Sequence, residues 1–453
     1  MPKSFKSKRP PLSKRGFTSP AIEKAIAAIS ARIKDPELAW LFANAFPNTL
    51  DTTIDHGTDE KGKPDTFVIT GDIDAMWLRD STNQVWPYLP FIAEDETLRR
   101  LIEGVIRRQA SCVLLDPYAN AFYKDGTRTS RHADDRTEMR PGVHERKYEL
   151  DSLCAVLRLS VGYHGLSGDI APFDATWVRS VKLILDTITT QQAGLGEKGY
   201  DAYSFARSGD RPADTVPFGN GHPGKRCGLS KSPFRPSDDG SMMPFLIPAN
   251  AMAVVCLRDT AILLRQLKGQ EKLAARAEKL AGEIDVAIAQ VGIVEHPEQG
   301  RIYAYEVDGF GSHYLMDDAN VPSLLSLSYL GYVEETDPVY QSTRKFILSK
   351  ANPYFFKGKA GEGIGGPHIG QGFIWPMGLV MQAMTSTSEE EIIRCLRILK
   401  GSHAGTGFMH ESFFKDEPKN FTRSWFAWAN TIFGELIVKL DRERPELLSK
   451  RVF

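Results

Sequence analysis

The feature of this sequence that most constrains its fold is a helical periodicity that recurs along almost the whole chain. Apolar residues repeat at intervals of three and four, and the connections between the periodic segments are alternately short and long. Strand-like runs are confined to 66–70 and 301–307. The segments with helical periodicity are 22–33, 36–46, 96–114, 147–166, 173–192, 247–267, 271–291, 318–331, 338–350, 372–384, 388–400 and 423–441.

Helices joined in this way pair as hairpins, and hairpins arranged in a ring gather their long loops at one end. The sequence therefore predicts an all-α fold, an (α/α)6 barrel with long loops and small β-hairpins at one rim. We expect residues 19–453 to form this single domain. Residues 1–18 are basic and rich in proline and serine, and we expect them to be a disordered arm.

The charges of the chain argue against several classes of partner. Lysine and arginine number 56 and aspartate and glutamate 57, so the net charge of −1 gives no reason to expect a nucleic-acid partner. No window approaches the roughly 18 apolar residues of a membrane span. The basic N-terminus also lacks the apolar core of a secretory signal. We therefore expect a cytoplasmic monomer that binds neither nucleic acid nor a membrane.

Neither the cysteines nor the acidic residues predict a metal or a cofactor. The five cysteines lie far apart without a CxxC pair, which is typical of neither a disulfide framework nor a zinc site. No HExxH or EF-hand spacing occurs, and the pair Asp317 and Asp318 is weak evidence for an ion. We expect no metal and no cofactor.

The segment 71–81 concentrates carboxylates, an arginine and a tryptophan within a few positions. Carboxylates accept hydrogen bonds from hydroxyl groups, and guanidinium groups donate hydrogen bonds to them. An indole ring stacks on the face of a sugar. We expect Asp74, Trp77, Arg79 and Asp80 to line a polar pocket. The alternative is that Asp80 caps a helix.

The segment 232–241 contains the adjacent carboxylates Asp238 and Asp239, preceded by Arg235. Two neighbouring carboxylates repel each other, so one of them keeps its proton toward neutral pH if it is partly buried. A protonated acid is what a leaving glycosidic oxygen requires. One of the two aspartates could instead cap the following helix, and both interpretations can hold together.

The segment 363–376 contains five glycines within ten residues, which allows the backbone to approach a ligand closely. The GxGxxG spacing and the GK[ST] motif are absent, so we reject a nucleotide site. His368, Gln371 and Trp375 suit hydrogen bonding to hydroxyl groups together with ring stacking, although a lone histidine is more often structural.

The segment 401–430 places Glu411 between His410 and Ser412, with Arg423 and Trp425 shortly after it. The density of aromatic residues here favours the wall of a sugar pocket over a solvated loop acid. Two further acids, Glu149 and Asp151, open the helix predicted over 147–166. They either interact with the helix dipole or face the mouth of the pocket.

Together these segments resemble the signature blocks of glycoside hydrolase family 125. The resemblance rests on TGDIDAMWLRDS (70–81), FRPSDD (234–239), GPHIGQGFIWPM (366–377) and MHESF with FTRSWFAWAN (409–430), and it extends over 38–441. It implies a metal-independent, inverting, exo-acting α-1,6-mannosidase on an (α/α)6 barrel. The implied substrate is an α-mannoside oligosaccharide or a glycan derived from N-glycans.

The resemblance also implies roles for individual residues. Glu411 corresponds to the general base and an aspartate of the RPSDD block to the general acid, for which we predict Asp238 rather than Asp239. Inversion requires two carboxyl groups about 6.5–9.5 Å apart with a water molecule between them. The expected substrate contacts are Asp74, Trp77, Arg79, Asp80, Glu149, Asp151, Arg235, Asp239, His368, Gln371, Trp375, His410, Arg423 and Trp425.

Two other functions fit the same residues. The first is a different carbohydrate-active enzyme on the same fold, such as a lyase, an epimerase or another glycosidase. The second is a mannoside-binding protein without catalytic activity. Product analysis separates the first from the mannosidase, and an absence of turnover identifies the second.

Overall fold

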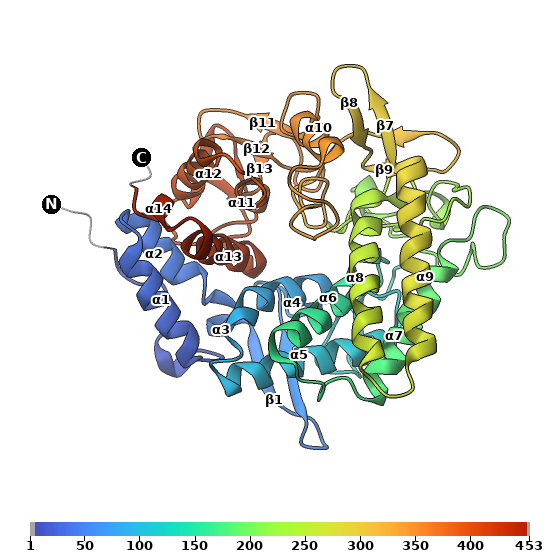
Figure 1. Ribbon diagram of the computed structural model, residues 1–453, viewed down its shortest axis with the longest axis horizontal. Helices are drawn as coiled ribbons and strands as arrows, with labels where there is room; N and C mark the ends of the chain where they lie inside the picture. Colours follow the sequence, from blue (N-terminus) through green and yellow to red (C-terminus); the bar gives the residue numbers. More distant parts are fainter. Residues whose placement is uncertain (1–4, 451–453) are drawn as a thin grey trace.

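The helices of the chain follow one another around a ring, and the last long helix returns to the first ones (Figure 1). The computed structural model describes residues 5–450. Helix α13 (Ala427–Glu443) closes the ring because it packs against α2 (Pro36–Ala45) and against α4 (Leu78–Val85). One large cluster of buried apolar side chains extends through nearly all of these helices. The mainly helical fold predicted from the periodicity is confirmed.

One set of helices, which we call the inner helices, is buried along most of its length. Helix α11 is almost entirely apolar and fully buried, and α8 is apolar and buried except for residues mainly in its second half. All eight residues of α4 are buried although most of them are polar, and other side chains bind several of them. Gln109, for example, donates hydrogen bonds of 2.9 Å to Ser81 and to Thr82. The inner helices are α4 (Leu78–Val85), α6 (Leu150–Ser167), α8 (Ile247–Arg265), α11 (Pro376–Met384) and α13 (Ala427–Glu443).

A second set, the outer helices, covers the inner ones and exposes one face to solvent. The consecutive helices α8 and α9 pack against each other as a hairpin of one inner and one outer helix, and so do α11 and α12. Most outer helices begin at a serine or aspartate whose side chain accepts a backbone N–H, which stabilises the helix start. The outer helices are α1 (Pro20–Arg32), α2 (Pro36–Ala45), α5 (Glu96–Leu115), α7 (Ala175–Thr190), α9 (Glu271–Ala287), α10 (Pro338–Ile347) and α12 (Glu389–Ser402).

Short helical turns connect these helices. Two of them, α3 and α14, lie near the two ends of the chain, where the ring closes. The short helices are α3 (Asn48–Thr52) and α14 (Pro445–Leu448), the 3₁₀ turns Leu12–Lys14, Trp86–Phe91, Pro212–Asp214 and Pro217–Gly219, and the π-helical turn Ile288–Gly292.

The strands are short and antiparallel, and they form three hairpins and three three-stranded sheets among the described residues. The three-stranded sheets have the strand orders β3-β4-β5, β10-β9-β6 and β13-β14-β15. The strands are β1 (Ile54–Thr58), β2 (Pro64–Val68), β3 (Met76–Trp77), β4 (Ala121–Phe122), β5 (Val143–Glu145), β6 (Phe245–Leu246), β7 (Ile293–His296), β8 (Gly300–Tyr303), β9 (Glu306–Val307), β10 (His313–Tyr314), β11 (Phe355–Lys357), β12 (Glu362–Ile364), β13 (Phe373–Ile374), β14 (Ser412–Phe414) and β15 (Glu417–Thr422).

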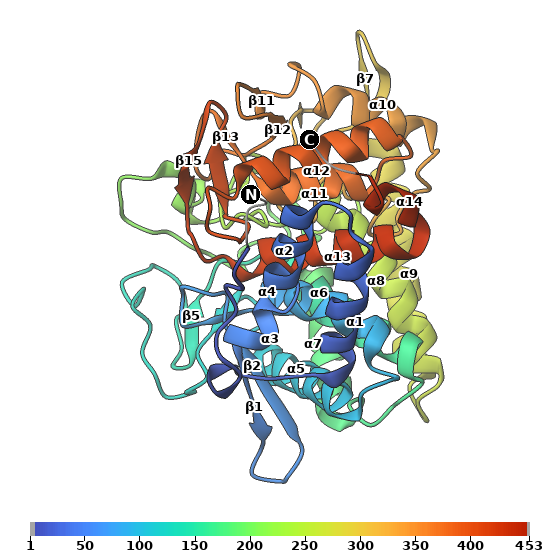
Figure 2. The ribbon, with the colours of Figure 1, turned by 90° about the vertical axis from the view of Figure 1, so that its left-hand side faces the viewer.

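The three-stranded sheets mark the end of the ring at which the inner helices begin. Strand β3 leads directly into α4 and β6 into α8, and a single residue separates β13 from α11. Figure 2 shows β5, β13 and β15 along one edge of the molecule, together with long loops. Each strand fixes the direction from which its inner helix starts. The same edge therefore receives segments that are far apart in the sequence.

The segment 318–331 forms consecutive turns, so the helix predicted there is wrong. The carboxylate of Asp317 accepts hydrogen bonds from the backbone N–H groups of Leu324 (2.8 Å) and Leu325 (3.0 Å). A side chain thus satisfies backbone groups that a helix would pair internally, and such bonds compete with helix formation. The leucines of the segment are nevertheless buried, which explains why its apolar pattern resembled that of a helix.

The beginning of the chain differs from the disordered arm expected over 1–18. Residues 1–4 lie outside the described residues, and residues 5–18 lie against the first helices. The guanidinium group of Arg9 binds Asp51 at 2.7 Å and Glu23 at 2.5 Å. Arg9 is therefore neutralised within the fold and ties this segment to α1 and to Asp51.

Helix α8 is long and apolar enough to cross a membrane by length and composition alone. Its apolar window is 78% buried inside the protein, because α8 is an inner helix packed between α6 and α9.

Candidate active site

A cavity opens where the inner helices α4, α11 and α13 begin, and it contains half of the expected site residues. It holds about 370 Å³, counted to its open mouth. The expected residues that line it are Trp77, Arg79, Asp80, Asp238, His368, Trp375, Glu411 and Arg423.

Asp238 reaches the cavity from a tight turn. The backbone N–H of Arg235 donates to the carbonyl of Asp239 (2.8 Å), and that of Asp238 donates to the carbonyl of Arg235 (2.9 Å). Asp238 has a φ of 65°, a left-handed conformation that is unfavourable for a residue with a side chain and is often found at functional sites. The turn separates the two neighbouring aspartates, because Asp238 lines the cavity with 27% of its side chain exposed whereas Asp239 is 1% exposed.

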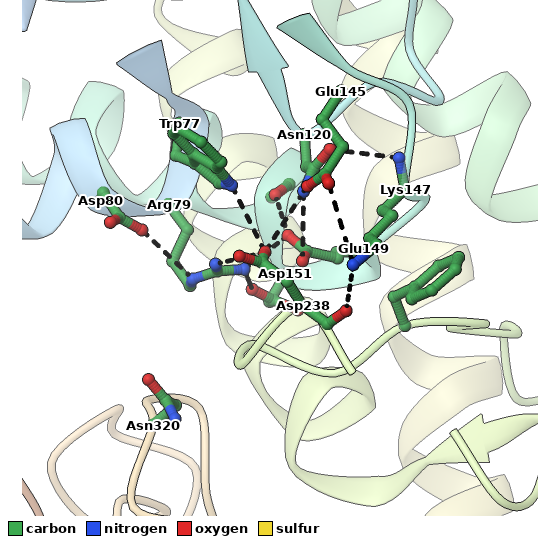
Figure 3. Close-up of polar contacts among 12 residues, drawn as sticks. Trp77, Arg79, Asp80, Asn120, Glu145, Lys147, Glu149, Asp151, Asp238 and Asn320 are labelled. Carbon is green, nitrogen blue, oxygen red and sulfur yellow. Dashed lines mark hydrogen bonds and ion pairs between the residues drawn. The ribbon is translucent and has the colours of Figure 1, made fainter. Parts of the chain in front are cut away.

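Three donors converge on one carboxylate oxygen of Asp238, as Figure 3 shows. Oδ1 of Asp238 accepts hydrogen bonds from Trp77 Nε1 (3.3 Å), Arg79 Nη2 (3.3 Å) and Asn120 Nδ2 (3.2 Å). Lys147 Nζ donates to the backbone carbonyl of Asp238 at 2.7 Å. The residue is therefore held both by its side chain and by its backbone.

The guanidinium group of Arg79 is surrounded by carboxylates. Its nearest partners are Glu149 (2.5 Å) and Asp151 (3.1 Å), which both accept from Nη1. Asp238 lies 3.3 Å from Nη2 and Asp80 lies 3.5 Å from Nε. A single cation cannot neutralise four buried carboxylates, so part of this group must hold protons.

The pKa values of these acids reflect this crowding. Burial raises the pKa of Asp80 to about 6, although Arg79 acts in the opposite direction. Burial likewise raises the pKa of Asp151, and it raises that of Glu149 well above its usual range. Burial acts in the same direction on Asp238, but Arg79 and a hydrogen bond from Glu149 outweigh it and lower the pKa of Asp238. The protons of the cluster therefore lie on the most buried acids.

Asp239 is paired with His368 rather than with Asp238. The Nδ1 atom of His368 lies 2.9 Å from Oδ1 of Asp239. Burial alone would lower the pKa of His368, but Asp239 outweighs this effect and raises it. Asp239 thus orients a histidine that lines the cavity, and it does not line the cavity itself.

Glu411 enters the cavity from the residue before strand β14. Its Oε1 lies 3.4 Å from Nη1 of Arg423, and its backbone N–H donates to the carbonyl of Arg423 (3.4 Å). Asp72 holds the other side of Arg423 with contacts of 2.5 Å to Nη2 and 3.1 Å to Nε, and the guanidinium group lies 4.6 Å from the centre of the Phe426 ring. Asp72 and Phe426 therefore fix the cation that orients Glu411.

Aromatic residues form the rest of the wall. Trp77, Trp375 and Trp428 line the cavity from three different inner-helix starts. The Nε1 atoms of Trp375 and Trp428 and the hydroxyl of Ser237 are buried without a hydrogen-bond partner among the described residues. Buried donors are normally satisfied, so a wall with free donors suits a ligand that carries hydroxyl groups.

Three of the expected contacts do not line the cavity because they lie toward solvent or behind its wall. Asp74 forms an ion pair of 2.8 Å with Arg128, and its side chain is 75% exposed. Gln371 lies in an exposed turn after His368. Trp425 is half-buried outside the lining.

Two further expected contacts, Arg235 and His410, are occupied by other parts of the protein. Arg235 Nε binds Glu306 at 2.6 Å, and its backbone belongs to the turn that presents Asp238. The ring of His410 stacks on that of Phe421 with their centres 3.6 Å apart, and its Nε2 lies 2.9 Å from the Thr406 hydroxyl. Both residues support neighbouring segments and do not line the cavity.

The sequence analysis missed several residues of the site. Asn120 binds Asp238 from the long charged connection 115–146, which offers no pattern that distinguishes one asparagine. Asn320 lines the cavity from the segment that was predicted to be a helix. Phe426 and Trp428 lie within a segment already chosen, and their aromatic character was the available signal.

Within residues 5–450, no group of three or more histidine, cysteine, aspartate or glutamate side chains is placed to hold a metal ion. Cations of the protein itself, Arg79, Lys147 and Arg423, lie among the acids of the site.

Comparisons with known proteins place the chain in one family. The family model of metal-independent α-mannosidases (GH125) matches residues 35–438. The meiotically up-regulated gene 157 protein of Schizosaccharomyces pombe is 45% identical over 457 residues, which cover 98% of this chain and 90% of that protein.

Solved structures resemble the whole chain. A metal-independent α-mannosidase structure from Streptococcus pneumoniae, a non-productive substrate complex with α-1,6-mannobiose, is 39% identical with a TM-score of 0.90 and covers 95% of this chain and 100% of its own. A bacterial glucoamylase in complex with acarbose has a TM-score of 0.55 at 14% identity and covers 96% of this chain and 59% of its own. The second likeness concerns the fold alone.

Proposed function

The chain belongs to glycoside hydrolase family 125, the metal-independent α-mannosidases, and from this premise we propose that it is an exo-acting, inverting α-1,6-mannosidase. The observation that carries the proposal is that two carboxylates from distant segments, Asp238 and Glu411, line one small cavity with different partners. The Streptococcus pneumoniae relative was observed with α-1,6-mannobiose, which supports the linkage.

We propose that the ring is an (α/α)6 barrel in which the turns of 318–331 take the place of a sixth inner helix. Two contacts of Tyr329 support this placement, because its hydroxyl lies 3.1 Å from both carboxylate oxygens of Glu435 in α13 and Arg158 of α6 lies 4.9 Å from its ring centre. The fold likeness to glycosidases at low identity agrees with it.

In the proposed reaction Asp238 is the general acid. Trp77, Arg79 and Asn120 hold its Oδ1, so the orientation of the carboxyl group is fixed before substrate arrives. Asp238 donates a proton to the glycosidic oxygen as the bond from that oxygen to the mannose C1 breaks. We favour Asp238 over Asp239 because Asp239 is buried against His368 and is absent from the lining.

Glu411 is the proposed general base. Arg423 contacts one of its oxygens at 3.4 Å, which orients the carboxylate within the cavity. Glu411 accepts a proton from a water molecule while the oxygen of that water attacks C1 from the face opposite to the leaving oxygen, so the configuration inverts. The expected separation of about 6.5–9.5 Å between the two carboxyl groups stays a prediction.

The size and the wall of the cavity support the exo mode and the substrate class. A hollow of about 370 Å³ has little room beyond a terminal sugar residue and part of its neighbour. Trp77, Trp375 and Trp428 line this hollow, and aromatic walls suit the apolar faces of sugar rings. We therefore expect single mannose units to leave from non-reducing ends of α-mannoside oligosaccharides, including fragments of N-glycans.

The experiment that tests this function is a time course of product release from α-1,6-, α-1,3- and α-1,2-linked mannobiose, with a longer α-1,6-mannan oligosaccharide to test the exo mode. We expect free mannose from the α-1,6-linked disaccharide and a stepwise shortening of the longer chain. Internal cleavage would contradict the exo mode, and an unsaturated or epimerised product would contradict hydrolysis. Binding without turnover would identify the protein as a mannoside-binding protein.

A further inference from the structure

We propose that Glu149 stores the proton that Asp238 delivers to the glycosidic oxygen, and is thus a positioning residue that acts through the general acid. The inference rests on the proposed function. It concerns a residue that does not line the cavity and that the sequence suggested only as a contact at its mouth. Its basis is the geometry that joins Glu149 to Asp238.

The two carboxyl groups share the same two donors. The guanidinium of Arg79 binds Glu149 through Nη1 (2.5 Å) and Asp238 through Nη2 (3.3 Å). The amide of Asn120 lies 3.4 Å from Oε1 of Glu149 and 3.2 Å from Oδ1 of Asp238. Figure 3 shows Arg79 and Asn120 on two sides of the pair. Two acids fixed on the same guanidinium and the same amide are close enough to be joined by a hydrogen bond.

The contacts of Glu149 determine which of its oxygens carries the proton. Oε2 already accepts from Arg79 Nη1 (2.5 Å) and from the Ser152 hydroxyl (2.8 Å), so its lone pairs are occupied. Oε1 has only the long contact with Asn120. The proton therefore belongs on Oε1, on the side of Asn120 and Asp238.

The difference in burial between the two acids explains why the proton rests on Glu149 in the open site. The side chain of Glu149 is 0% exposed, whereas that of Asp238 is 27% exposed. Burial favours the neutral form, and it raises the pKa of Glu149 well above its usual range. When a sugar fills the cavity it removes water from Asp238, so the two acids become more alike and the proton can move to Asp238.

The step is balanced in atoms and charge. A proton passes from Glu149 Oε1 to Asp238, and Asp238 gives a proton to the glycosidic oxygen as the C1–O bond breaks. Glu149 is left as a carboxylate beside the Arg79 cation, and Glu411 holds the proton taken from the attacking water. Exchange with solvent returns the proton from Glu411 to the Glu149–Asp238 pair. The other charged or titratable groups that interact with the pair are Arg79, Asp80, His144, Glu145, Lys147, Asp151, Tyr203 and His368.

The test uses Glu149→Gln, which keeps the size of the side chain and its neutral form but cannot release a proton. The pH profile of kcat/KM is measured on two substrates. One is α-1,6-mannobiose, whose leaving group needs protonation, and the other is 2,4-dinitrophenyl α-mannoside, whose leaving group does not. With mannobiose we expect the basic limb to move at least one pH unit lower, because a lone carboxyl beside Arg79 loses its proton more easily than a pair of acids. At pH values above the shifted limb, kcat/KM of Glu149→Gln is then at least tenfold lower than that of the wild type.

With the dinitrophenyl substrate we expect a loss of less than threefold. A merely structural role for Glu149 would lower the rates on both substrates equally and leave the limb in place, which would overturn the proposal, and so would wild-type behaviour of the variant. Asp151→Asn is the matched control because Asp151 binds the same Nη1 atom (3.1 Å), whereas the amide of Asn120 binds Glu149 and Asp238. We expect its losses to be equal on the two substrates.

Two measurements keep the test decisive. If Glu149→Gln does not fold, as judged by circular dichroism, Ser152→Ala replaces it, because loss of the Ser152 donor frees Oε2 to hold the proton away from Asp238. For Ser152→Ala we expect a smaller loss of kcat/KM than for Glu149→Gln, again larger on mannobiose than on the dinitrophenyl substrate. Equal losses on the two substrates would overturn the proposal. A wild-type protein that releases no mannose from mannobiose would instead overturn the proposed function.

Discussion

Carboxylates at the starts of the outer helices and at the starts of the inner helices have opposite electrostatic properties. Asp95 precedes the outer helix α5. Burial alone would raise the pKa of Asp95, but hydrogen bonds from Ser19 and from Thr97 outweigh burial and lower it. Asp80 lies in the first turn of the inner helix α4, and burial raises its pKa to about 6. The same residue type near the same helix position is thus charged in one place and partly protonated in the other.

The inner and outer helices also differ in how their N-terminal backbone N–H groups are capped. Among the described residues, no inner helix has a side-chain hydrogen bond at its N-cap position, whereas most outer helices do. The outer helices place their acids where these stabilise the fold. The inner helices crowd acids around Arg79 at a cost in stability, and such crowding is typical of sites where acids transfer protons.

The largest effect that this comparison predicts is on catalysis. Asp238→Asn and Glu411→Gln each remove a proposed proton-transfer group, so we expect each to lower kcat/KM on α-1,6-mannobiose by roughly 10²–10⁴-fold or more. Thermal unfolding of both variants should stay close to that of the wild type. Asp239→Asn is the matched control beside Asp238, and we expect a smaller loss because Asp239 acts through His368. A silent Asp238→Asn with an inactive Asp239→Asn would reverse our assignment of the acid.

The next largest effect is on stability. Arg79→Met leaves the acids of the inner cluster without their central cation, and breaking a buried ion pair in this way costs about 3–5 kcal/mol. Arg276→Met on the outer helix α9 removes a half-exposed pair with Asp186 and costs about 0–1 kcal/mol. Urea unfolding of both variants measures the difference. Equal losses would show that the inner and outer charges are not distinct.

The pH dependence of stability should have opposite signs at the two positions. The raised pKa of Asp80 means that the folded state keeps a proton that the unfolded chain releases, so its contribution to stability falls as the pH rises from about 4 to about 6. The lowered pKa of Asp95 means that its contribution is present above its ordinary value and is lost as the pH falls below it. Melting temperatures of Asp80→Asn and Asp95→Asn relative to wild type, measured from pH 3 to pH 8, test both signs. A common sign would contradict the comparison.

The smallest effect concerns a single outer cap. Asp95 accepts the backbone N–H groups of Thr97 (3.0 Å) and Leu98 (3.1 Å), so Asp95→Ala should cost about 1 kcal/mol of stability. Its kcat/KM on mannobiose should equal that of the wild type, because α5 begins away from the cavity. A loss of activity at unchanged stability would show that the outer helix starts also serve the site.

Much of the fold could be predicted from the sequence because its helices carry a clear apolar period. Residues 96–114 were expected as a helix, and α5 extends over Glu96–Leu115. The failure at 318–331 arises because burial alone gave that segment a helical pattern, whereas the carboxylate of Asp317 satisfies its backbone in turns. Apolar spacing reports which residues are buried and does not report where backbone hydrogen bonds go.

The site could be predicted only where several informative residues stand together. Trp77, Arg79 and Asp80 come from one dense segment, and all three line the cavity. Asn120 could not be found because a lone asparagine in a charged connection looks like any other. Asp74 belongs to the same dense segment as Arg79 but points to solvent, since only the folded chain determines which side of a turn faces the cavity.

The central claim is that Asp238 and Glu411 act from opposite faces of a terminal mannose, one as acid and one as base. The most direct test is proton NMR of α-1,6-mannobiose during its first minutes of digestion, before the anomers of free mannose equilibrate. We expect β-mannose to appear first and α-mannose to follow by mutarotation. Initial release of α-mannose would contradict it.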